Sequence, residues 1–137
     1  MIKEYKINWS IPKNIGYFIS SNEKGHSRNQ YKYANFSFNV GDNKKSVKSN
    51  INDLKNLYSI NNIAFMNQLH TNKTRELIYY KNHTNTDGIF TRNKNIACAV
   101  LTADCIPLLI TDRLGTFIGC IHAGWRGLKS NLSLIHI

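Results

Sequence analysis

The sequence predicts an α+β or layered α/β protein, and three observations support this class. First, apolar residues recur at helical spacing across positions 45–58, at Val47, Ile51, Leu54 and Leu57. Second, residues 96–101, 107–110 and 116–121 are continuous apolar runs, which are typical of strands buried on both faces. Third, the segment DRLG at 112–115 joins the last two runs and has the composition of a hairpin turn.

Shorter patterns predict the remaining elements. Residues 5–9 and 16–20 are strand-like and precede a polar loop at 21–30. Residues 33–40 alternate aromatic and polar side chains before a turn at 41–43, and residues 63–68 and 77–80 predict two more strands. Because no repeat or linker interrupts the chain, we expect one domain over residues 1–131.

The length and cysteine content favour a cytoplasmic protein. A chain of 137 residues with 42% hydrophobic content can bury the core of one small domain. No apolar run is long enough to span a bilayer, and the N-terminal segment lacks the pattern of an export signal. We therefore expect no membrane partner, and we interpret the three cysteines as thiols or metal ligands.

The formal net charge of +10 raises the possibility of a basic nucleic-acid-binding module. The basic residues are spread along the chain and accompany abundant Asn and Ile, as AT-rich codons would produce. Because no recognition motif is present, we expect no nucleic acid as partner. Small anionic substrates would still be attracted by the charge.

The last six residues, LSLIHI at 132–137, have the sequence of a translated sequencing adapter. We interpret them as an adapter-derived tail and leave them out of the fold. His136 then has no functional meaning. An ordinary amphipathic helix end is the alternative interpretation.

Three segments place a side chain that can bind a metal at the end of an apolar run: QLH at 68–70, TADC at 102–105 and HAGWRG at 122–127. Binding and catalytic residues concentrate in the loops that follow strands. The imidazoles of His70 and His122 and the thiolate of Cys105 suit zinc, with a fourth position left for water or substrate. An open position of this kind indicates catalysis.

The spacing of these residues also permits a second interpretation. It matches no compact zinc motif, and a single His or Cys beside a strand is usually a core residue. Cys98 and Cys120 lie within apolar runs and are expected to pack in the core, because free cysteine is among the most buried residue types.

Four motifs stand in order along the chain: QLH at 68–70, TDGIFT at 86–91, AVLTADCIP at 99–107 and HAGWRGL at 122–128. In this order they resemble the laccase-domain family, first labelled polyphenol oxidase and now described as purine nucleoside phosphorylase. The resemblance covers most of the chain from about Tyr33 onward. The last two motifs are highly specific.

The resemblance implies a layered α/β/β/α sandwich with mixed sheets, incomplete at the C-terminus, and a zinc ion bound by His70, Cys105 and His122. It implies phosphorolysis of adenosine, inosine and S-methyl-5'-thioadenosine, and adenosine deaminase activity, for which zinc would acidify the attacking water. The partners would be purine nucleosides and phosphate. Alternatives attached to the family are a copper-dependent polyphenol oxidase and a hydrolase that edits peptidoglycan precursors.

Three further residues are candidates for the chemistry. Arg126 either holds phosphate with its guanidinium fork or pairs with a local carboxylate. Asp104 either orients a ligand imidazole, acts as an acid or base, or caps a turn. Gln68 either donates a hydrogen bond to the substrate or fixes its loop.

The chain also departs from the family pattern. Ser20, Ser21 and Asn22 stand where an Arg and paired glycines are common, and Thr71 replaces the glycine that commonly follows the first-motif histidine. The family pattern continues with further strands and a Gly-Pro-containing segment that this sequence lacks. We therefore expect the fragment to turn over poorly.

Overall fold

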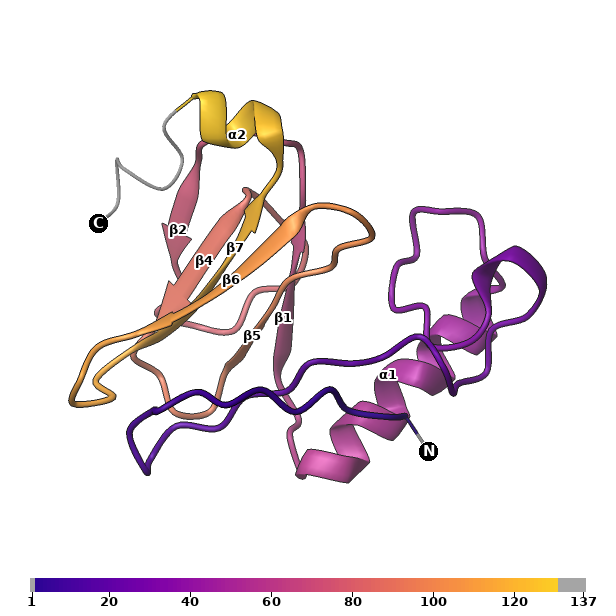
Figure 1. Cartoon of the computed structure of the whole chain (residues 1–137), viewed down its shortest axis with the longest axis horizontal. Coiled ribbons are helices and arrows are strands. Elements are labelled where there is room, and N and C mark those ends of the chain that lie inside the picture. The colour runs from indigo at the N-terminus through magenta and orange to yellow at the C-terminus, as the bar shows by residue number, and fades with distance from the viewer. Residues whose placement is uncertain (1, 131–137) are drawn as a thin grey trace. The chain divides into compact units, whose positions relative to one another are not determined.

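The computed structural model describes residues 2–130, which divide into two compact units. The first unit contains the described residues up to Ser10 together with Gly16–Ile60, and the second contains Ile11–Ile15 together with the described residues from Asn61 onward. Figure 1 labels helix α1 in the first unit and strands β1, β2, β4, β5, β6 and β7 in the second. The tail predicted at 132–137 lies outside the described residues.

Helix α1 (Lys44–Tyr58) confirms the helix predicted from the apolar spacing. It begins at Asn43, whose side chain accepts hydrogen bonds from the Lys45 and Ser46 amides, as a helix N-cap does. It ends at Ser59, which has left-handed backbone geometry. No helix among the described residues is long and apolar enough to cross a membrane.

The strands predicted in the first unit are largely absent. Residues 33–40 form no strand, so that prediction was wrong, and a short 3₁₀ helix, η1 (Asn29–Tyr31), precedes them. The reason is Asn50 of α1, whose Nδ2 donates to the carbonyl oxygens of Asn35 at 2.7 Å and Tyr33 at 3.4 Å. Residues 5–9 and 16–20 form no extended ladder: an isolated bridge pairs Glu4 with Ser20, and the Tyr5 amide donates to the Ile19 carbonyl at 2.8 Å.

The second unit contains one parallel and one mixed sheet, so the protein is a mixed α/β fold (Figure 1). The parallel sheet has the order β3-β1-β5 and is formed by Thr84–Asn85, Ile63–Asn67 and Ala97–Ala99. The mixed sheet has the order β2-β4-β7-β6 and is formed by Thr74–Glu76, Gly88–Thr91, Ile118–Ala123 and Ile106–Thr111. The short helix α2 (Trp125–Lys129) follows β7.

Four strands of the second unit, β1, β5, β6 and β7, lie where the sequence predicts them. The strand expected at 77–80 is wrong, because β2 ends at Glu76 and Ile78 to Tyr80 are exposed. Strands β2, β3 and β4 were not predicted. The predicted turn is confirmed: the Gly115 amide donates to the Asp112 carbonyl at 3.2 Å, and Gly115 has a φ of +66° that favours glycine.

A hydrophobic core is shared by strands of both sheets. Its buried members are Ala64, Met66, Leu77, Ile89, Ile96 and Cys120, and Cys98, Val100 and Leu109 pack against them. The two core thiols are inert, because burial raises the pKa of Cys98 to about 12 and that of Cys120 well above its ordinary value. Both cysteines are therefore packing residues, as the sequence predicts.

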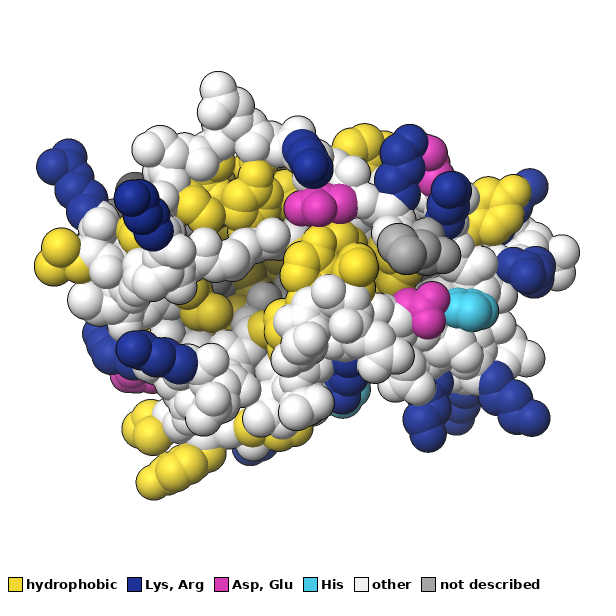
Figure 2. All heavy atoms as spheres, turned by 90° about the horizontal axis from the view of Figure 1, so that it is seen from below, with side chains coloured by type: hydrophobic (Ala, Val, Ile, Leu, Met, Phe, Trp, Pro, Cys, Tyr) yellow, Lys and Arg dark blue, Asp and Glu magenta, His cyan; other side chains and the backbone are white. Residues whose placement is uncertain are grey.

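Figure 2 shows one face of the molecule, on which Lys and Arg side chains stand singly or in small groups between uncharged side chains.

The buried Asn50 gives the first prediction. Its amide donates to the backbone of the 33–35 segment and accepts from the His26 amide at 2.7 Å, so truncation leaves buried polar groups unpaired. We predict that Asn50→Ala lowers the free energy of unfolding by about 2–4 kcal/mol. The matched control is Asn52→Ala on the exposed face of α1, where chemical denaturation should show almost no change.

Candidate metal centre

The three candidate ligands come from separate segments of the second unit. His70 follows β1, Cys105 immediately precedes β6, and His122 lies near the end of β7. One imidazole nitrogen from each histidine and the Cys105 Sγ all lie within 4.8 Å of one another. The fold therefore brings together three side chains that are far apart in the sequence.

Antiparallel pairing of β6 with β7 places Cys105 near His122. Pro107 pairs with His122 and Ile106 with Ala123, so Cys105 comes just beyond the last paired residue. Strand β7 is also paired with β4, where Gly88 is opposite Ile121. The position of His122 is thus determined from both sides of its strand.

His122 is the buried member of the cluster, with 4% of its surface exposed. Its Nδ1 lies 2.9 Å from Oδ1 of Asp87, which has no exposed surface. An ionised carboxylate only accepts hydrogen bonds, so Nδ1 carries the proton and donates. This leaves the lone pair on Nε2, and a carboxylate behind a ligand histidine is a common feature of zinc sites.

Hydrogen bonds keep Asp87 in its charged form. Burial alone would raise its pKa, but hydrogen bonds from His122, from the amide and hydroxyl of Thr71 and from the His70 amide hold the pKa below its ordinary value. The Leu69 amide is a further donor at 3.3 Å. A negative charge therefore lies directly behind the candidate ligands at neutral pH.

Gly124 lies against all three candidate ligands. A Cβ at this position would be 2.9 Å from Cδ2 of His70, 3.4 Å from Sγ of Cys105 and 3.6 Å from Cε1 of His122. The first of these distances is shorter than side chains tolerate. The absence of a side chain at Gly124 thus allows the two imidazoles to meet edge to face, with their centroids 4.7 Å apart.

The donor set has the chemistry of a zinc site. Two imidazoles and a thiolate are ligands that zinc prefers, and copper accepts the same types. Within residues 2–130, the cluster of His70, Cys105 and His122 is the group of His, Cys, Asp and Glu side chains close enough to hold a metal. The His70 side is exposed and the His122 side is buried, so one side of the cluster is open to an incoming molecule.

Gln68 uses both ends of its amide on the backbone of Leu101. Its Nε2 donates to the Leu101 carbonyl at 2.7 Å, and its Oε1 accepts from the Leu101 amide at 2.8 Å. This pair of bonds connects the segment before His70 to the segment before Cys105. The contacts favour the loop-fixing role over direct binding of substrate.

Asp104 and Arg126 are both exposed. Among the described residues, Asp87 rather than Asp104 makes the contact to a ligand imidazole. The Arg126 guanidinium carbon lies 4.6 Å from the centroid of the Trp125 ring, a cation–π contact. No carboxylate of residues 2–130 forms a salt bridge with Arg126, so the structure does not support the local ion pair.

Residues 16–134 match the family described as multi-copper polyphenol oxidoreductase laccase. The chain belongs to this family. The match confirms the resemblance carried by the four motifs. All three candidate ligands and Asp87 lie within the matched residues.

Two relatives are named as nucleoside enzymes. The Haemophilus influenzae protein named purine nucleoside phosphorylase is 38% identical to this laccase-family chain over 122 residues, covering 88% of this chain and 50% of the relative. The Escherichia coli protein named purine nucleoside phosphorylase YfiH is 32% identical over 127 residues, covering 88% of this chain and 50% of the relative. The chain thus spans about half the length of these curated relatives.

Solved structures share the fold. The crystal structure of a Neisseria meningitidis protein matches with a TM-score of 0.85 and 30% identity, covering 96% of this chain and 54% of that one. The crystal structure of YlmD from Geobacillus stearothermophilus matches with a TM-score of 0.79 and 20% identity, covering 85% of this chain and 47% of that one. The second match shows the fold alone.

Sequence reasoning missed one residue that the structure places at the centre. Asp87 was part of a quoted motif but received no role. The only signal in the sequence was the carboxylate of the TDG segment at 86–88. In the fold, this segment lies between β3, which pairs with the strand that leads to His70, and β4, which pairs with the strand that carries His122. Only the fold shows that this carboxylate lies behind His122.

The contacts of Gly124 give the second prediction. Gly124→Ala would push the His70 ring away from its neighbours, so we expect zinc affinity to fall by about tenfold, the scale of changes beside metal ligands. Competition with a chromogenic chelator would measure the affinity. Gly16→Ala is the control, because no atom lies within 4 Å of a Cβ at that position. Equal affinity in both variants would contradict the steric argument.

Proposed function

We propose that this chain is part of a zinc-dependent purine nucleoside phosphorylase that also deaminates adenosine. The observation that carries the proposal is the convergence of the His70, Cys105 and His122 ligand atoms within 4.8 Å, with a buried carboxylate behind His122. The names of the two relatives support the substrate class. Adenosine, inosine and S-methyl-5'-thioadenosine are the proposed nucleosides.

His70, Cys105 and His122 would hold the zinc ion. Zinc bound there would supply a Lewis acid and an acidified water at neutral pH. Cys105 is suited to binding because its Sγ lies beside the two imidazoles, whereas burial raises the pKa of the Cys98 and Cys120 thiols above the ordinary value. Cys105 is therefore the candidate metal ligand, and Cys98 and Cys120 are packing residues.

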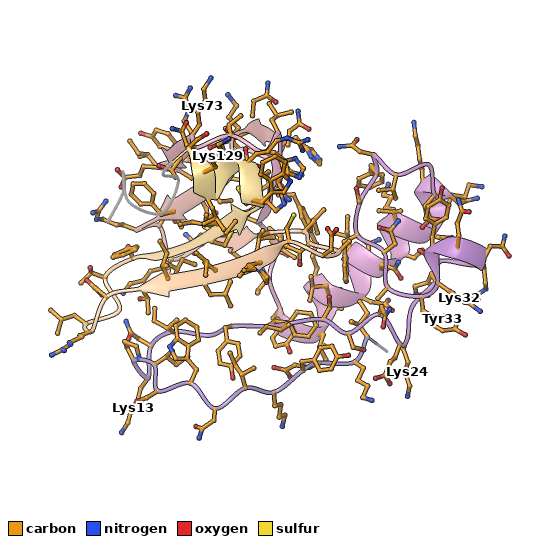
Figure 3. All side chains as sticks on the ribbon, turned by 45° about the horizontal axis from the view of Figure 1, so that its top comes forward. Lys13, Lys24, Lys32, Tyr33, Lys73 and Lys129 are labelled. Atoms are coloured by element: carbon orange, nitrogen blue, oxygen red, sulfur yellow. The ribbon has the colours of Figure 1, made fainter. Side chains whose placement is uncertain are left out.

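Phosphate would be held by cations near the open side of the centre. Arg126 lies two residues after Gly124, which contacts the ligands, and it has no carboxylate partner among residues 2–130. Lys73 and Lys129 are exposed at the same end of the second unit as α2 (Figure 3). The Asn72 side chain donates to the Ser130 carbonyl at 2.9 Å, which joins the loop carrying Lys73 to the end of α2. These cations would attract and orient an anion.

Asp104 is the proposed acid or base. It directly precedes Cys105 and is exposed, so its carboxylate is accessible to a molecule that approaches the centre. In deamination it would take a proton from the attacking water and pass it to the departing amine, and in phosphorolysis it would pass a proton from dihydrogen phosphate to the departing purine. Each role requires only a proton transfer at the Asp104 carboxyl oxygen.

The complete enzyme would be longer than this chain. The relatives have about twice its length, so we propose that their remaining half completes the layered α/β/β/α sandwich and the nucleoside pocket. A copper-dependent polyphenol oxidase is the second candidate, supported by the family description and by ligand types that copper accepts. A multicopper centre would need more ligands than the single cluster that residues 2–130 supply. The peptidoglycan-editing hydrolase would use the same ligands.

Metal content gives the third prediction. We expect about one zinc per chain in the purified protein by elemental analysis, and loss of most of it in Cys105→Ala. Cys98→Ala is the matched control and should keep its zinc, because the Cys98 thiol packs in the core. Copper in place of zinc would favour the oxidase. A well-folded parent without metal would contradict the proposed site.

Phosphate dependence of nucleoside consumption gives the fourth prediction. In the complete protein, which includes the half that this chain lacks, we expect inosine to disappear faster with phosphate than without it, and Arg126→Ala to raise the KM for phosphate by about tenfold or more. Arg113→Ala is the control, since Arg113 lies in the exposed turn after β6. The Haemophilus influenzae relative, assayed under the same conditions, is the positive control. Consumption that is independent of phosphate in both proteins would count against phosphorolysis.

A further inference from the structure

One carboxylate contacts the segments that carry both histidines of the centre. Asp87 accepts five hydrogen bonds: from His122 Nδ1, from the amides of Leu69, His70 and Thr71, and from the Thr71 hydroxyl. The carboxylate has no exposed surface. The negative charge is therefore stabilised by these five donors rather than by water. Two of the donors, the His122 Nδ1 and the His70 amide, belong to candidate ligands.

The His70 side of this arrangement is held through the backbone. Three consecutive amides point at the carboxylate, with N–O distances of 3.3 Å for Leu69, 2.9 Å for His70 and 2.7 Å for Thr71. His70 has a φ of +58°, a left-handed conformation that costs free energy for a residue other than glycine. The hydrogen bonds to Asp87 offset this cost and keep the turn in place.

The His122 side is held at two points by the same residue. The Asp87 carboxylate accepts from Nδ1 of His122 at 2.9 Å, and the Asp87 carbonyl accepts from the His122 amide at 2.7 Å. The ring of His122 is thus fixed in orientation by the side chain and in position by the backbone. The assigned proton on Nδ1 leaves Nε2 for binding.

Thr71 adds a bond that a glycine could not make. Its Oγ1 donates to Oδ2 of Asp87 at 2.8 Å and accepts from the Lys73 amide at 3.3 Å. The hydroxyl therefore connects the carboxylate to the start of β2. A side chain at this position stabilises the turn that Asp87 organises.

We propose that Asp87 is the positioning residue for both imidazoles of the metal centre, and that the Thr71 hydroxyl reinforces it in this chain. The inference rests on the metal site proposed above, but the contacts of Asp87 with the His70 amide and with the His122 ring do not require a metal. Asp87 sets the tautomer of His122 and the backbone turn of His70. The centre is therefore preorganised before any ion binds.

An amide in place of the carboxylate cannot satisfy both groups of donors. The side chain of Asp87→Asn has one acceptor oxygen, so its NH₂ must face either His122 and the His70 amide or the Thr71 donors. Facing His122, the NH₂ would stabilise the Nε2–H tautomer, which has no lone pair for a metal at that nitrogen. Facing Thr71, it would break the turn that holds His70.

Zinc affinity and the His122 tautomer together test the proposal. We expect Asp87→Asn to weaken zinc binding by about 10- to 100-fold in chelator competition, the range for residues behind metal ligands. Thr86→Val is the matched control: Thr86 is buried and its hydroxyl donates to the Lys73 carbonyl at 2.6 Å, without touching the carboxylate. It should lower thermal stability while leaving the affinity unchanged. An Asp87→Asn affinity no lower than that of Thr86→Val would overturn the proposal.

A second measurement separates this inference from the proposed function. ¹⁵N NMR of the metal-free chain, assigned with His122→Gln, should show the Nδ1–H tautomer of His122 at a pH where imidazole is neutral. Asp87→Asn should move that signal toward the Nε2–H tautomer. The tautomer can be measured even if the parent binds no zinc. The absence of zinc would refute the metal site but not the positioning role of Asp87. An Nε2–H tautomer in the parent would refute the positioning role.

If Asp87→Asn does not fold, Thr71→Val provides a second test of the same hydrogen-bond network. Valine removes the hydroxyl, and with it the bond to Asp87 and the acceptor for the exposed Lys73 amide, while the Thr71 amide still donates to Asp87. We therefore expect a smaller loss of zinc affinity, on the order of threefold, with the fold intact. In a parent without zinc, a lower melting temperature of metal-free Thr71→Val is the expected result. Affinity and melting temperature both equal to the parent would overturn the reinforcing role of Thr71.

Discussion

The candidate metal centre depends on one buried charge, the carboxylate of Asp87. It lies at the start of β4, between the turn that follows β1 and the end of β7. A buried carboxylate without donors would be strongly destabilising, and this one is stabilised only when the His70 turn and the His122 ring both face it. Folding and assembly of the site are therefore coupled through the same set of hydrogen bonds.

The two sheets determine where the segments that carry His70, Cys105 and His122 lie. Strand β1 leads from the core into the His70 turn, and the β6–β7 pairing presents Cys105 and His122 at the same end. The core between the sheets contains only apolar side chains and two neutral thiols among its described members. The polar network of the centre and the apolar core thus consist of different residues on the same strands.

Sequence patterns predicted the features that depend on local order. Helix α1 follows from the spacing of Val47, Ile51, Leu54 and Leu57, and the β6–β7 hairpin follows from two apolar runs and a turn. The candidate ligands were identifiable from their motifs. The role of Asp87 was not, because it arises from contacts across the fold. Residues 33–40 failed as a strand for a similar reason, since Asn50 of α1 binds two of their carbonyls.

The hairpin between β6 and β7 has a consequence for how such a protein can change during evolution. Side chains alternate between the two faces of a strand, so a shift of one residue in the β6–β7 register would turn His122 to the opposite face. The register is set at the Asp112–Gly115 turn, at the other end of the hairpin from the ligands. A single-residue insertion that shifted this register would turn the His122 side chain away from Cys105 and His70, although all three residues would remain in the sequence. The presence of the three residues in a sequence is therefore not sufficient for the centre; the register of the hairpin must be kept as well.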